Sequence, residues 1–213
     1  MNHKIFTDRL LNWYAKKGRK FPWRQSCSPY KILITEKLLQ QTSYGHVLRV
    51  YENFFQKYPT IEALAEGEVS SIENEIKSLG FQRQRAVQLK NMANAIVNEY
   101  HSEIPDYKGS LTKLSGVGEY IADAVLCYAF NNDIVPVDVN IRRVAKRLVG
   151  WEETPKDKKI QQEMMKFLPR KNVRKFNWAL LDFSALICSR IPKCNKCFAT
   201  DVCNYYQNIR SLE

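Results

Sequence analysis

Apolar residues recur three and four positions apart along almost the whole of this 213-residue chain. That spacing is typical of amphipathic helices, whose apolar face lies against a core. No stretch alternates between apolar and polar residues for long enough to predict a strand. The pattern predicts helices over residues 5–14, 30–41, 47–58, 61–65, 70–79, 83–100, 121–130, 140–148, 158–168 and 173–187. We therefore expect an all-α fold.

Residues that break helices lie between these segments. Pro29 begins one predicted helix, and Pro59 separates two others. Gly80 is placed to end a helix, and Pro105 interrupts the chain after the next one. No apolar run reaches the ~20 residues that a membrane-spanning helix needs, so we expect a soluble protein. No signal-peptide pattern opens the chain, which favours a reducing, cytoplasmic location.

The charge balance favours a polyanionic partner. Lysine and arginine number 33 against 22 aspartate and glutamate residues, which gives a formal net charge of +11. Nucleic acid is such a partner. Ribosomal and membrane-surface proteins share this balance, so charge alone does not choose between these classes. The basic residues recur along the whole chain and do not form a separate tail.

Four cysteines close to the C-terminus follow the spacing C-x5-C-x2-C-x5-C: Cys188, Cys194, Cys197 and Cys203. Thiolates this close together are candidate ligands of an iron–sulfur cluster. A four-thiolate zinc site is the main alternative, although zinc sites usually have two C-x2-C pairs and only Cys194 and Cys197 form one. Two disulfides are the third possibility, which a reducing compartment disfavours. Cys127, inside an apolar run, is expected to be a small buried residue.

A glycine-containing segment, Leu-Ser-Gly-Val-Gly, precedes one of the predicted helices. It comprises Leu114, Gly116, Gly118 and the residues between them. Such a turn can present bare backbone N–H groups at the start of the following helix and bind a phosphate. An ordinary helix–helix turn with a glycine cap is the alternative. Asp138 follows that helix, where it can lie beside the bound backbone, cap the helix that it precedes, or do both.

These motifs resemble the helix-hairpin-helix glycosylases of base excision repair, the superfamily of endonuclease III and the adenine-DNA glycosylase MutY. The resemblance covers nearly the whole chain. Residues 21–24, Phe-Pro-Trp-Arg, and residues 34–42, Ile-Thr-Glu-Lys-Leu-Leu-Gln-Gln-Thr, are similar to the N-terminal motif of MutY. Residues 114–118 are similar to the hairpin, Val137 and Asp138 to the segment with the catalytic aspartate, and the four cysteines to the cluster loop.

A narrower resemblance is to the archaeal Mig-type mismatch glycosylases, which act on thymine opposite guanine. It rests on residues 45–47, 84–86 and 182–185 and on Tyr120. The resemblance implies a DNA glycosylase that flips and excises a mismatched thymine or uracil opposite guanine and leaves an abasic site. It also implies a monomer that acts on double-stranded DNA in a prokaryotic cell.

The resemblance further implies a two-lobed helical fold. One lobe would comprise approximately residues 25–135, with the helix-hairpin-helix near residues 108–130. The other would comprise residues 1–24 and 136–213. Its cluster loop, residues 188–203, would hold a [4Fe–4S] cluster through the four cysteines. The first cysteine gap has five residues where the superfamily usually has six, which makes this loop tighter.

Two carboxyl groups fit the chemistry of such an enzyme. An N-glycosidic bond breaks through a sugar cation, so catalysis needs a carboxylate to stabilise positive charge and an acid to help the base depart. Asp138 fits the first role. Glu36 fits the second, because it interrupts an apolar run and apolar surroundings would raise the pKa of its carboxyl. By resemblance Glu36 is the catalytic glutamate of MutY, and the alternative is an exposed helix residue.

Tyr120 bears on the type of reaction. Superfamily members that also cut the strand carry a lysine here, whose amine attacks C1′ and forms a Schiff base. Tyr120 cannot do so, and a tyrosine can instead pack against the sugar or the flipped base. We therefore predict a monofunctional glycosylase. The alternative is that Tyr120 fills a helix interface.

The resemblance implies that two further loops contact DNA. Gln40 and Gln41 end an apolar helix, and Phe81 follows a glycine that ends another. These loops would supply the wedge that fills the space of the flipped base and the contacts to its partner. The alternative for the two glutamines is a solvated helix end, and the alternative for Phe81 is a position in the core. Arg85 is expected to contact phosphates. The remaining expected DNA-binding residues belong to the hairpin and are Leu114, Gly116 and Gly118.

Several residues depart from the Mig pattern. Gln40 and Gln41 stand where Mig carries arginines and MutY-like chains carry glutamines, which leaves the base preference open. Ser115 replaces the usual proline of the hairpin, and Glu119 puts a negative charge beside the phosphate-binding turn. A minimal MutY-like adenine-DNA glycosylase is therefore an alternative. A non-catalytic DNA-binding protein and a zinc-stabilised nucleic-acid module are others, and the presence of both catalytic carboxyl groups argues against the non-catalytic binder.

Overall fold

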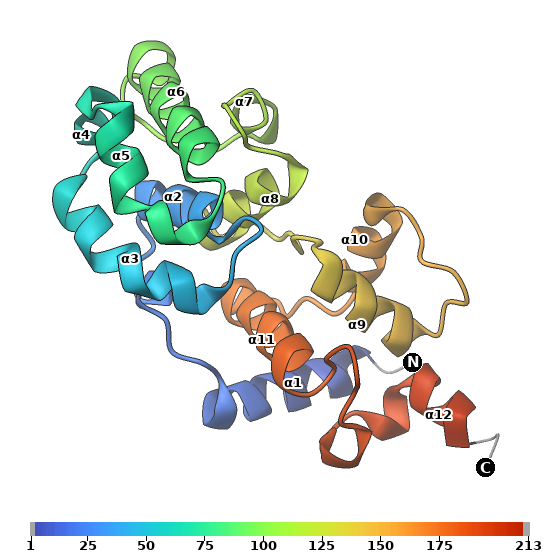
Figure 1. Cartoon of the computed structure of the whole chain (residues 1–213). Coiled ribbons are helices and arrows are strands. Elements are labelled where there is room, and N and C mark those ends of the chain that lie inside the picture. Colours follow the sequence, from blue (N-terminus) through green and yellow to red (C-terminus); the bar gives the residue numbers. More distant parts are fainter. Residues whose placement is uncertain (1–2, 211–213) are drawn as a thin grey trace. The chain divides into compact units, whose positions relative to one another are not determined.

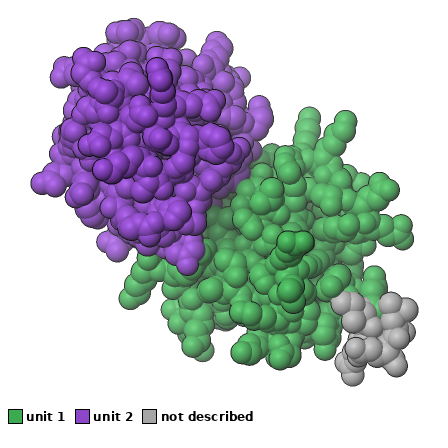
Figure 2. All heavy atoms as spheres, viewed as in Figure 1, with its two compact units in different colours: residues 1–20, 131–213 green, residues 21–130 purple. Residues whose placement is uncertain are grey.

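The computed structural model describes residues 3–210, and every regular element in that range is a helix (Figure 1). The chain divides into two compact units (Figure 2). Unit 2 is continuous and comprises residues 21–130, whereas unit 1 combines residues 1–20 with residues 131–213. The sequence placed the corresponding boundaries near residues 25 and 135.

Unit 2 is built around one central helix. Its α-helices are α2 (Pro29–Leu39), α3 (Tyr44–Lys57), α4 (Ile61–Glu66), α5 (Val69–Glu75), α6 (Gln82–Tyr100), α7 (Lys108–Leu111) and α8 (Glu119–Tyr128), with short 3₁₀ helices η1 (Pro22–Arg24) and η2 (Lys77–Leu79). Residues 32–38 of α2 are all buried. α2 packs against α8 and α3, and α6 packs against α4 and α5. Because this part of α2 is buried on all sides, the polar side chains of residues 32–38 lie inside unit 2.

Unit 1 combines the first helix of the chain with the last four. Its elements are α1 (His3–Lys17), α9 (Val139–Val149), α10 (Asp157–Met165), α11 (Val173–Leu186), α12 (Asn204–Arg210) and the 3₁₀ helices η3 (Cys194–Lys196) and η4 (Thr200–Val202). α11 packs against both α1 and α9, and α9 also contacts α10 and α12. Fully buried Phe6, Phe176 and Leu180 lie in its core. The fully buried side chain of Asp182 accepts hydrogen bonds from the backbone N–H and the guanidinium of Arg19, which ties the end of α1 to α11.

Short-range signals explain where these helices begin and end. Ser28 caps α2 through its side-chain oxygen, and Pro29 is the first residue of that helix. Thr60 caps α4 in the same way. Gly150 ends α9 with φ of 80°, a left-handed conformation that glycine adopts without steric cost. The predicted start of a helix at Pro29 is therefore confirmed.

The predicted helices differ from the observed ones at several ends. The helix predicted over residues 30–41 ends at Leu39, and the one predicted over residues 70–79 is split into α5 and η2. The sequence pattern missed α12 and did not delimit the four-residue α7, because helices this short offer too few turns for a periodic pattern. None of the helices between residues 3 and 210 is both long and apolar enough to span a bilayer.

Candidate functional site

The glycine-containing turn joins α7 to α8 in unit 2. Gly116 has φ of +71°, and a Cβ atom on it would lie 2.3 Å from the Nζ atom of Lys37, so no other residue fits without displacement. Gly118 is exposed, has extended backbone and directly precedes α8. Leu114 is buried and accepts a hydrogen bond from the backbone N–H of Val117. The turn is therefore anchored at Leu114 and open at Gly118.

Lys108 partly compensates the negative charge of Glu119 at this turn. Lys108 forms ion pairs of 2.7 Å with Glu119 and with Asp123, so one ammonium group from α7 bridges two carboxylates on α8. Burial opposes the charged ammonium, but the hydrogen bonds to Asp123 and Glu119 prevail and raise the pKa of Lys108. Lys108 thus balances one of the two negative charges of Glu119 and Asp123.

Lys37 is the functional candidate that sequence reasoning missed. Its side chain is fully buried, and Nζ donates to the side-chain oxygens of Gln40 (3.0 Å) and Gln88 (2.9 Å) and to the carbonyl of Gly116 (2.8 Å). Burial, assisted by the nearby charge of Arg85, lowers the pKa of Lys37 to about 8. The sequence signal that could have indicated Lys37 was its position inside an apolar run. A lysine in a helical pattern is normally assigned to the solvated face, so this signal was not used. Lys37 connects α2, α6 and the glycine turn.

Arg85, which we expected to contact phosphates, is a buried residue of α6. Its side chain is 5% exposed, and the guanidinium donates to the backbone carbonyls of Lys37 and Gln40. Those carbonyls lie at the end of α2, where a helix has no partners of its own for them. Arg85 therefore shapes the loop that follows α2.

The loop after α2 is exposed and faces a small pocket. Gln40 and Gln41 follow the last residue of α2, and Gln41 has left-handed backbone with φ of 53°. Phe81 is 66% exposed and also left-handed, with φ of 48°, so its alternative role as a core residue is wrong. These three residues, with Gln84, Arg85 and Gln88, line a surface pocket of about 180 Å³. An exposed aromatic ring and several amide groups thus converge within unit 2.

The two other candidates in unit 2 lie on packed helices. Glu36 is 9% exposed, so its alternative role as an exposed helix residue is wrong. Tyr120 lies in the first turn of α8 and is partly buried. α2, which carries Glu36, packs against α8. Neither side chain is on a freely solvated face.

Asp138 caps α9 in unit 1, as its place in the sequence predicted. Its Oδ1 atom accepts hydrogen bonds from the backbone N–H groups of Asn140 (2.9 Å) and Ile141 (2.7 Å). The Oδ2 atom accepts a third from the side-chain amide of Asn140 at 2.7 Å. Three donors therefore fix the orientation of this carboxylate at the positive end of the helix dipole. Val139, the next residue, is 66% exposed, so the site is at the surface of unit 1.

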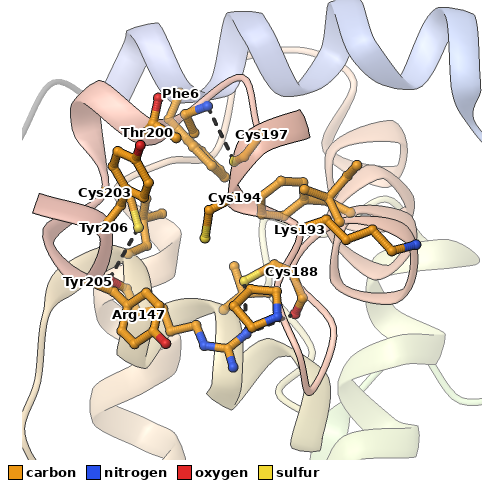
Figure 3. A pocket seen from close by; sticks show the side chains of 16 residues that line it. Phe6, Arg147, Cys188, Lys193, Cys194, Cys197, Thr200, Cys203, Tyr205 and Tyr206 are labelled. Atoms are coloured by element: carbon orange, nitrogen blue, oxygen red, sulfur yellow. Dashed lines mark hydrogen bonds between the residues drawn. The ribbon is translucent and has the colours of Figure 1, made fainter. Parts of the chain in front are cut away.

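The four C-terminal cysteines surround one small cavity in unit 1, of about 30 Å³ (Figure 3). All four are free thiols, so the disulfide alternative is wrong. Burial raises the pKa of Cys197 to about 11 and also raises the pKa values of Cys194 and Cys203, with the neighbouring thiols adding to the effect. Apolar side chains of Phe6, Val144, Leu148 and Phe183 complete the wall.

Hydrogen bonds to the thiols come from the surrounding backbone and from one arginine. The backbone N–H of Ala199 donates to Cys197, and the guanidinium of Arg147 lies 3.5 Å from the sulfur of Cys188. N–H donors of this kind stabilise thiolate ligands. Among residues 3–210, however, no three potential ligand side chains lie close enough together to hold a single metal ion. The arrangement does not match a tetrahedral zinc site.

Comparison with known proteins identifies similar enzymes along the whole chain. The family model of HhH-GPD superfamily base excision DNA repair proteins matches residues 34–170. The chain is 40% identical over 208 residues to a thymine/uracil-DNA glycosylase of Methanothermobacter thermautotrophicus, and this covers 96% of the chain and 94% of the relative. It is 34% identical to an adenine DNA glycosylase of Mycobacterium tuberculosis, of which it covers 65%.

Comparison with solved structures also identifies similar proteins. A thermostable thymine-DNA glycosylase superposes with a TM-score of 0.92 at 38% identity, and 97% of each chain is covered. Endonuclease III in a non-covalent complex with DNA superposes with a TM-score of 0.83 at 23% identity, which shows a common fold.

Proposed function

Because the chain belongs to the HhH-GPD superfamily of base excision DNA repair proteins, we propose that it is a monofunctional DNA glycosylase that excises thymine or uracil opposite guanine. The similarity to a thymine/uracil-DNA glycosylase along nearly the full length of both chains carries this proposal. The reaction breaks the N-glycosidic bond of the mismatched nucleotide and leaves an abasic site. Double-stranded DNA is its partner, which the net charge of +11 also favours.

Asp138 would stabilise the sugar cation that forms as the base leaves. The three donors from Asn140 and Ile141 hold its carboxylate in one orientation, so little reorganisation is needed during the reaction. A carboxylate fixed in this way is complementary to positive charge that develops on C1′ and the ring oxygen. The cap and the catalytic role are compatible, because capping fixes the group that the chemistry uses.

Glu36 would supply the proton that the departing base needs. Glu36 is only 9% exposed, and a carboxyl group that is shielded from bulk water can pass its proton to the departing base. Water then adds to C1′, and its proton returns to one of the two carboxylates. The overall reaction is hydrolysis of the N-glycosidic bond, which releases the free base and leaves an abasic sugar.

The residues near the glycine turn support the monofunctional reaction. Tyr120 has no amine, and the buried Lys37 is enclosed, with its ammonium donating to three acceptors. Lys108 is engaged with Glu119 and Asp123. We expect sodium borohydride to trap no covalent enzyme–DNA adduct on a G:T duplex. A strong adduct would overturn the monofunctional proposal.

The glycine turn and the pocket of unit 2 would hold the DNA. The exposed turn at Gly118 offers backbone N–H groups to a phosphate, and Lys108 offsets part of the charge of the adjacent Glu119. Phe81 is both largely exposed and in a left-handed conformation, an arrangement that costs stability and that insertion into a base stack would justify. Gln40 and Gln41 lie at the same pocket and would contact the base left without its partner.

The cysteine cavity would hold a [4Fe–4S] cluster through Cys188, Cys194, Cys197 and Cys203. Four thiols around one apolar cavity, with N–H donors to two of the sulfurs, fit a polynuclear cluster better than a single ion. The cluster, when bound, supplies iron–thiolate bonds that hold residues 188–203 in place. The proposed base excision uses no group of this cavity.

Excision of adenine is the alternative, favoured by the 34% identity to an adenine DNA glycosylase and by the glutamine pair. A panel of end-labelled duplexes separates the two. Purified protein in excess is incubated with G:T, G:U, A:G and adenine opposite oxidised guanine, and alkali then cleaves any abasic site. We expect cleavage at thymine and uracil, whereas cleavage only at adenine would favour the alternative.

The same panel tests the hypothesis of a non-catalytic binder. A binder would retain G:T duplex in a gel-shift assay without producing an alkali-sensitive site at any enzyme concentration. Binding without cleavage, from protein that contains iron, would therefore overturn the proposal that the chain is a thymine or uracil glycosylase. The two catalytic carboxyl groups, Glu36 and Asp138, are the reason that we expect cleavage.

A further inference from the structure

The ammonium group of Lys37 has three protons and three acceptors. The acceptors are the side-chain oxygens of Gln40 and Gln88 and the carbonyl oxygen of Gly116, all within 3.0 Å of Nζ. An ammonium can only donate, so the atom that each glutamine turns towards Lys37 must be its amide oxygen. Lys37 thereby settles which end of both amides faces inward.

The amide nitrogens of these glutamines face the other way. In a planar carboxamide, oxygen and nitrogen point in directions about 120° apart, so an oxygen held by buried Lys37 directs the NH₂ group away from it. Gln40 is exposed and Gln88 is half-buried, and both line the pocket of unit 2. Neither amide nitrogen donates to another residue in the part of the chain that the structure describes. Both NH₂ groups are thus available as donors at the pocket.

The remaining walls of the pocket strengthen this donor character. Arg85 also lines the pocket, and its guanidinium donates to the carbonyls of Lys37 and Gln40, so these acceptors are not presented to a ligand. Phe81 adds an exposed aromatic ring on which a planar base can stack. A ring beside two hydrogen-bond donors is complementary to a base edge with acceptors.

We propose that Lys37 determines which base this pocket accepts, by fixing the amides of Gln40 and Gln88 with their NH₂ groups outward. The inference rests on the proposed function, because it assigns the pocket to the base that remains after its partner is flipped. Guanine presents two adjacent acceptors, N7 and O6, on its major-groove edge. Adenine presents the acceptor N7 beside an amino group. That amino group is a donor, so it would face the second NH₂ group of the pocket without forming a hydrogen bond.

Lys37 is therefore a positioning residue that acts through two glutamines and does not itself touch DNA. If Lys37 were absent, each glutamine amide could rotate by half a turn and present its oxygen instead. The pocket would then accept guanine and adenine edges about equally. This account explains how glutamines, whose amides offer both a donor and an acceptor, can act as selective donors here.

Binding to duplexes that lack the target base tests the proposal directly. A stable abasic-site analogue, tetrahydrofuran, is placed opposite guanine, 7-deazaguanine, 2-aminopurine or adenine, and dissociation constants are measured by fluorescence anisotropy. No target base is present, so base-pair strength does not influence the comparison. We expect the unaltered protein to bind the guanine duplex about tenfold more tightly than the adenine duplex, with 7-deazaguanine and 2-aminopurine between them.

The variant Lys37→Met replaces the ammonium by an apolar group of similar length. We expect its preference for guanine over adenine to fall to about twofold or less, because the amides are no longer fixed. Lys90→Met is the matched control, since Lys90 donates to the backbone carbonyl of Ala65 away from the pocket. It should keep the full preference. Equal preferences in the Lys37→Met and unaltered proteins would overturn the proposal.

Gln88→Met guards against a loss of folding in Lys37→Met. It removes one of the two amides and leaves Lys37 in place. We therefore expect the preference for guanine over adenine to fall from about tenfold to about threefold, which is half of its value on a logarithmic scale. An unchanged preference in this variant would also overturn the proposal. Excision of thymine opposite guanine is measured on the same preparations. Absence of excision by the unaltered protein would contradict the proposed function, whereas the binding preferences test Lys37 separately.

Discussion

Each unit gathers distant segments of the chain around a small group of polar atoms, but the two groups are completed differently. In unit 2, the ammonium of Lys37 joins α2, α6 and the glycine turn, and every proton has an acceptor within the protein. In unit 1, four thiols surround an apolar cavity, and their hydrogen bonds to the protein are few and long. The hydrogen bonds of the Lys37 centre are complete, whereas the four thiols are the proposed ligands of a [4Fe–4S] cluster.

The contrast shows two ways of stabilising loops that act on a ligand. A buried charge with all its hydrogen bonds made holds its neighbours in one arrangement, although its desolvation costs stability. Buried thiols make weak hydrogen bonds, and such a loop gains its stability when the thiols bind a metal centre. Variants that remove single groups should therefore have the largest effect on stability in unit 1 and a more selective effect in unit 2.

The strongest test of the contrast removes one thiol. We expect Cys197→Ala to abolish iron binding and to lower the free energy of unfolding by more than about 4 kcal/mol, because the loop loses its metal centre. Iron content, visible absorbance after anaerobic purification and chemical denaturation are measured together. Cys27→Ala is the matched control, since Cys27 is exposed and lies outside the cavity. Equal stability of both variants would contradict the proposed cluster.

The second test separates capping from catalysis at α9. We expect Asp138→Asn to lower the single-turnover rate of thymine excision about 10²–10³-fold, because the amide lacks the charge that stabilises the sugar cation. Asparagine caps helices as well as aspartate does, so the free energy of unfolding should change by less than about 0.5 kcal/mol. Duplex binding should persist. A rate within about threefold of the unaltered protein would argue against a catalytic role for Asp138.

Local features of the fold could be predicted from the sequence. The start of α2 is set by Ser28 and Pro29, and the start of α9 by Asp138, because a cap depends only on neighbouring residues. Burial of Glu36 followed from the apolar run around it. The turn at Gly116 was also recognisable, and its left-handed backbone confirms the need for glycine there.

The charged residues of unit 2 could not be placed in the same way. Lys37 meets Gln88 and Gly116, which lie 51 and 79 residues further along the chain, so no local pattern indicates the junction. Arg85 was predicted to contact phosphates as one of the basic residues of a DNA-binding chain. Its actual partners are carbonyl groups at the end of α2, whose position depends on the packing of α2 and α6.

Two glycine variants sharpen the comparison within unit 2. We expect Gly116→Ala to lower the free energy of unfolding by about 2 kcal/mol, because its backbone is left-handed and the new Cβ would displace the ammonium of Lys37. Gly118→Ala should cost less than about 0.5 kcal/mol, since a Cβ atom there would meet no other atom within 4 Å and the φ of Gly118 is −92°. Thermal denaturation measures both. Equal losses would contradict the close contact between Gly116 and Lys37.

The smallest expected effect is a pH dependence of stability that comes from Lys37. Burial and the charge of Arg85 lower its pKa to about 8 in the folded protein, from 10.5 for an ordinary lysine, while Gln40, Gln88 and Gly116 contribute neutral groups. Between these two values the unfolded chain binds more protons than the folded one, so this group makes unfolding less favourable as pH rises.

We therefore expect the free energy of unfolding of the unaltered protein to gain about 1 kcal/mol relative to that of Lys37→Met between pH 7 and pH 9. Deprotonation also leaves Lys37 with one donor fewer for its three acceptors. The preference for guanine over adenine should accordingly weaken over the same range in the unaltered protein and stay constant in Lys37→Met. A parallel pH dependence of stability in the two proteins would show that Lys37 remains charged, and the junction in unit 2 would then be held by its charge throughout this range.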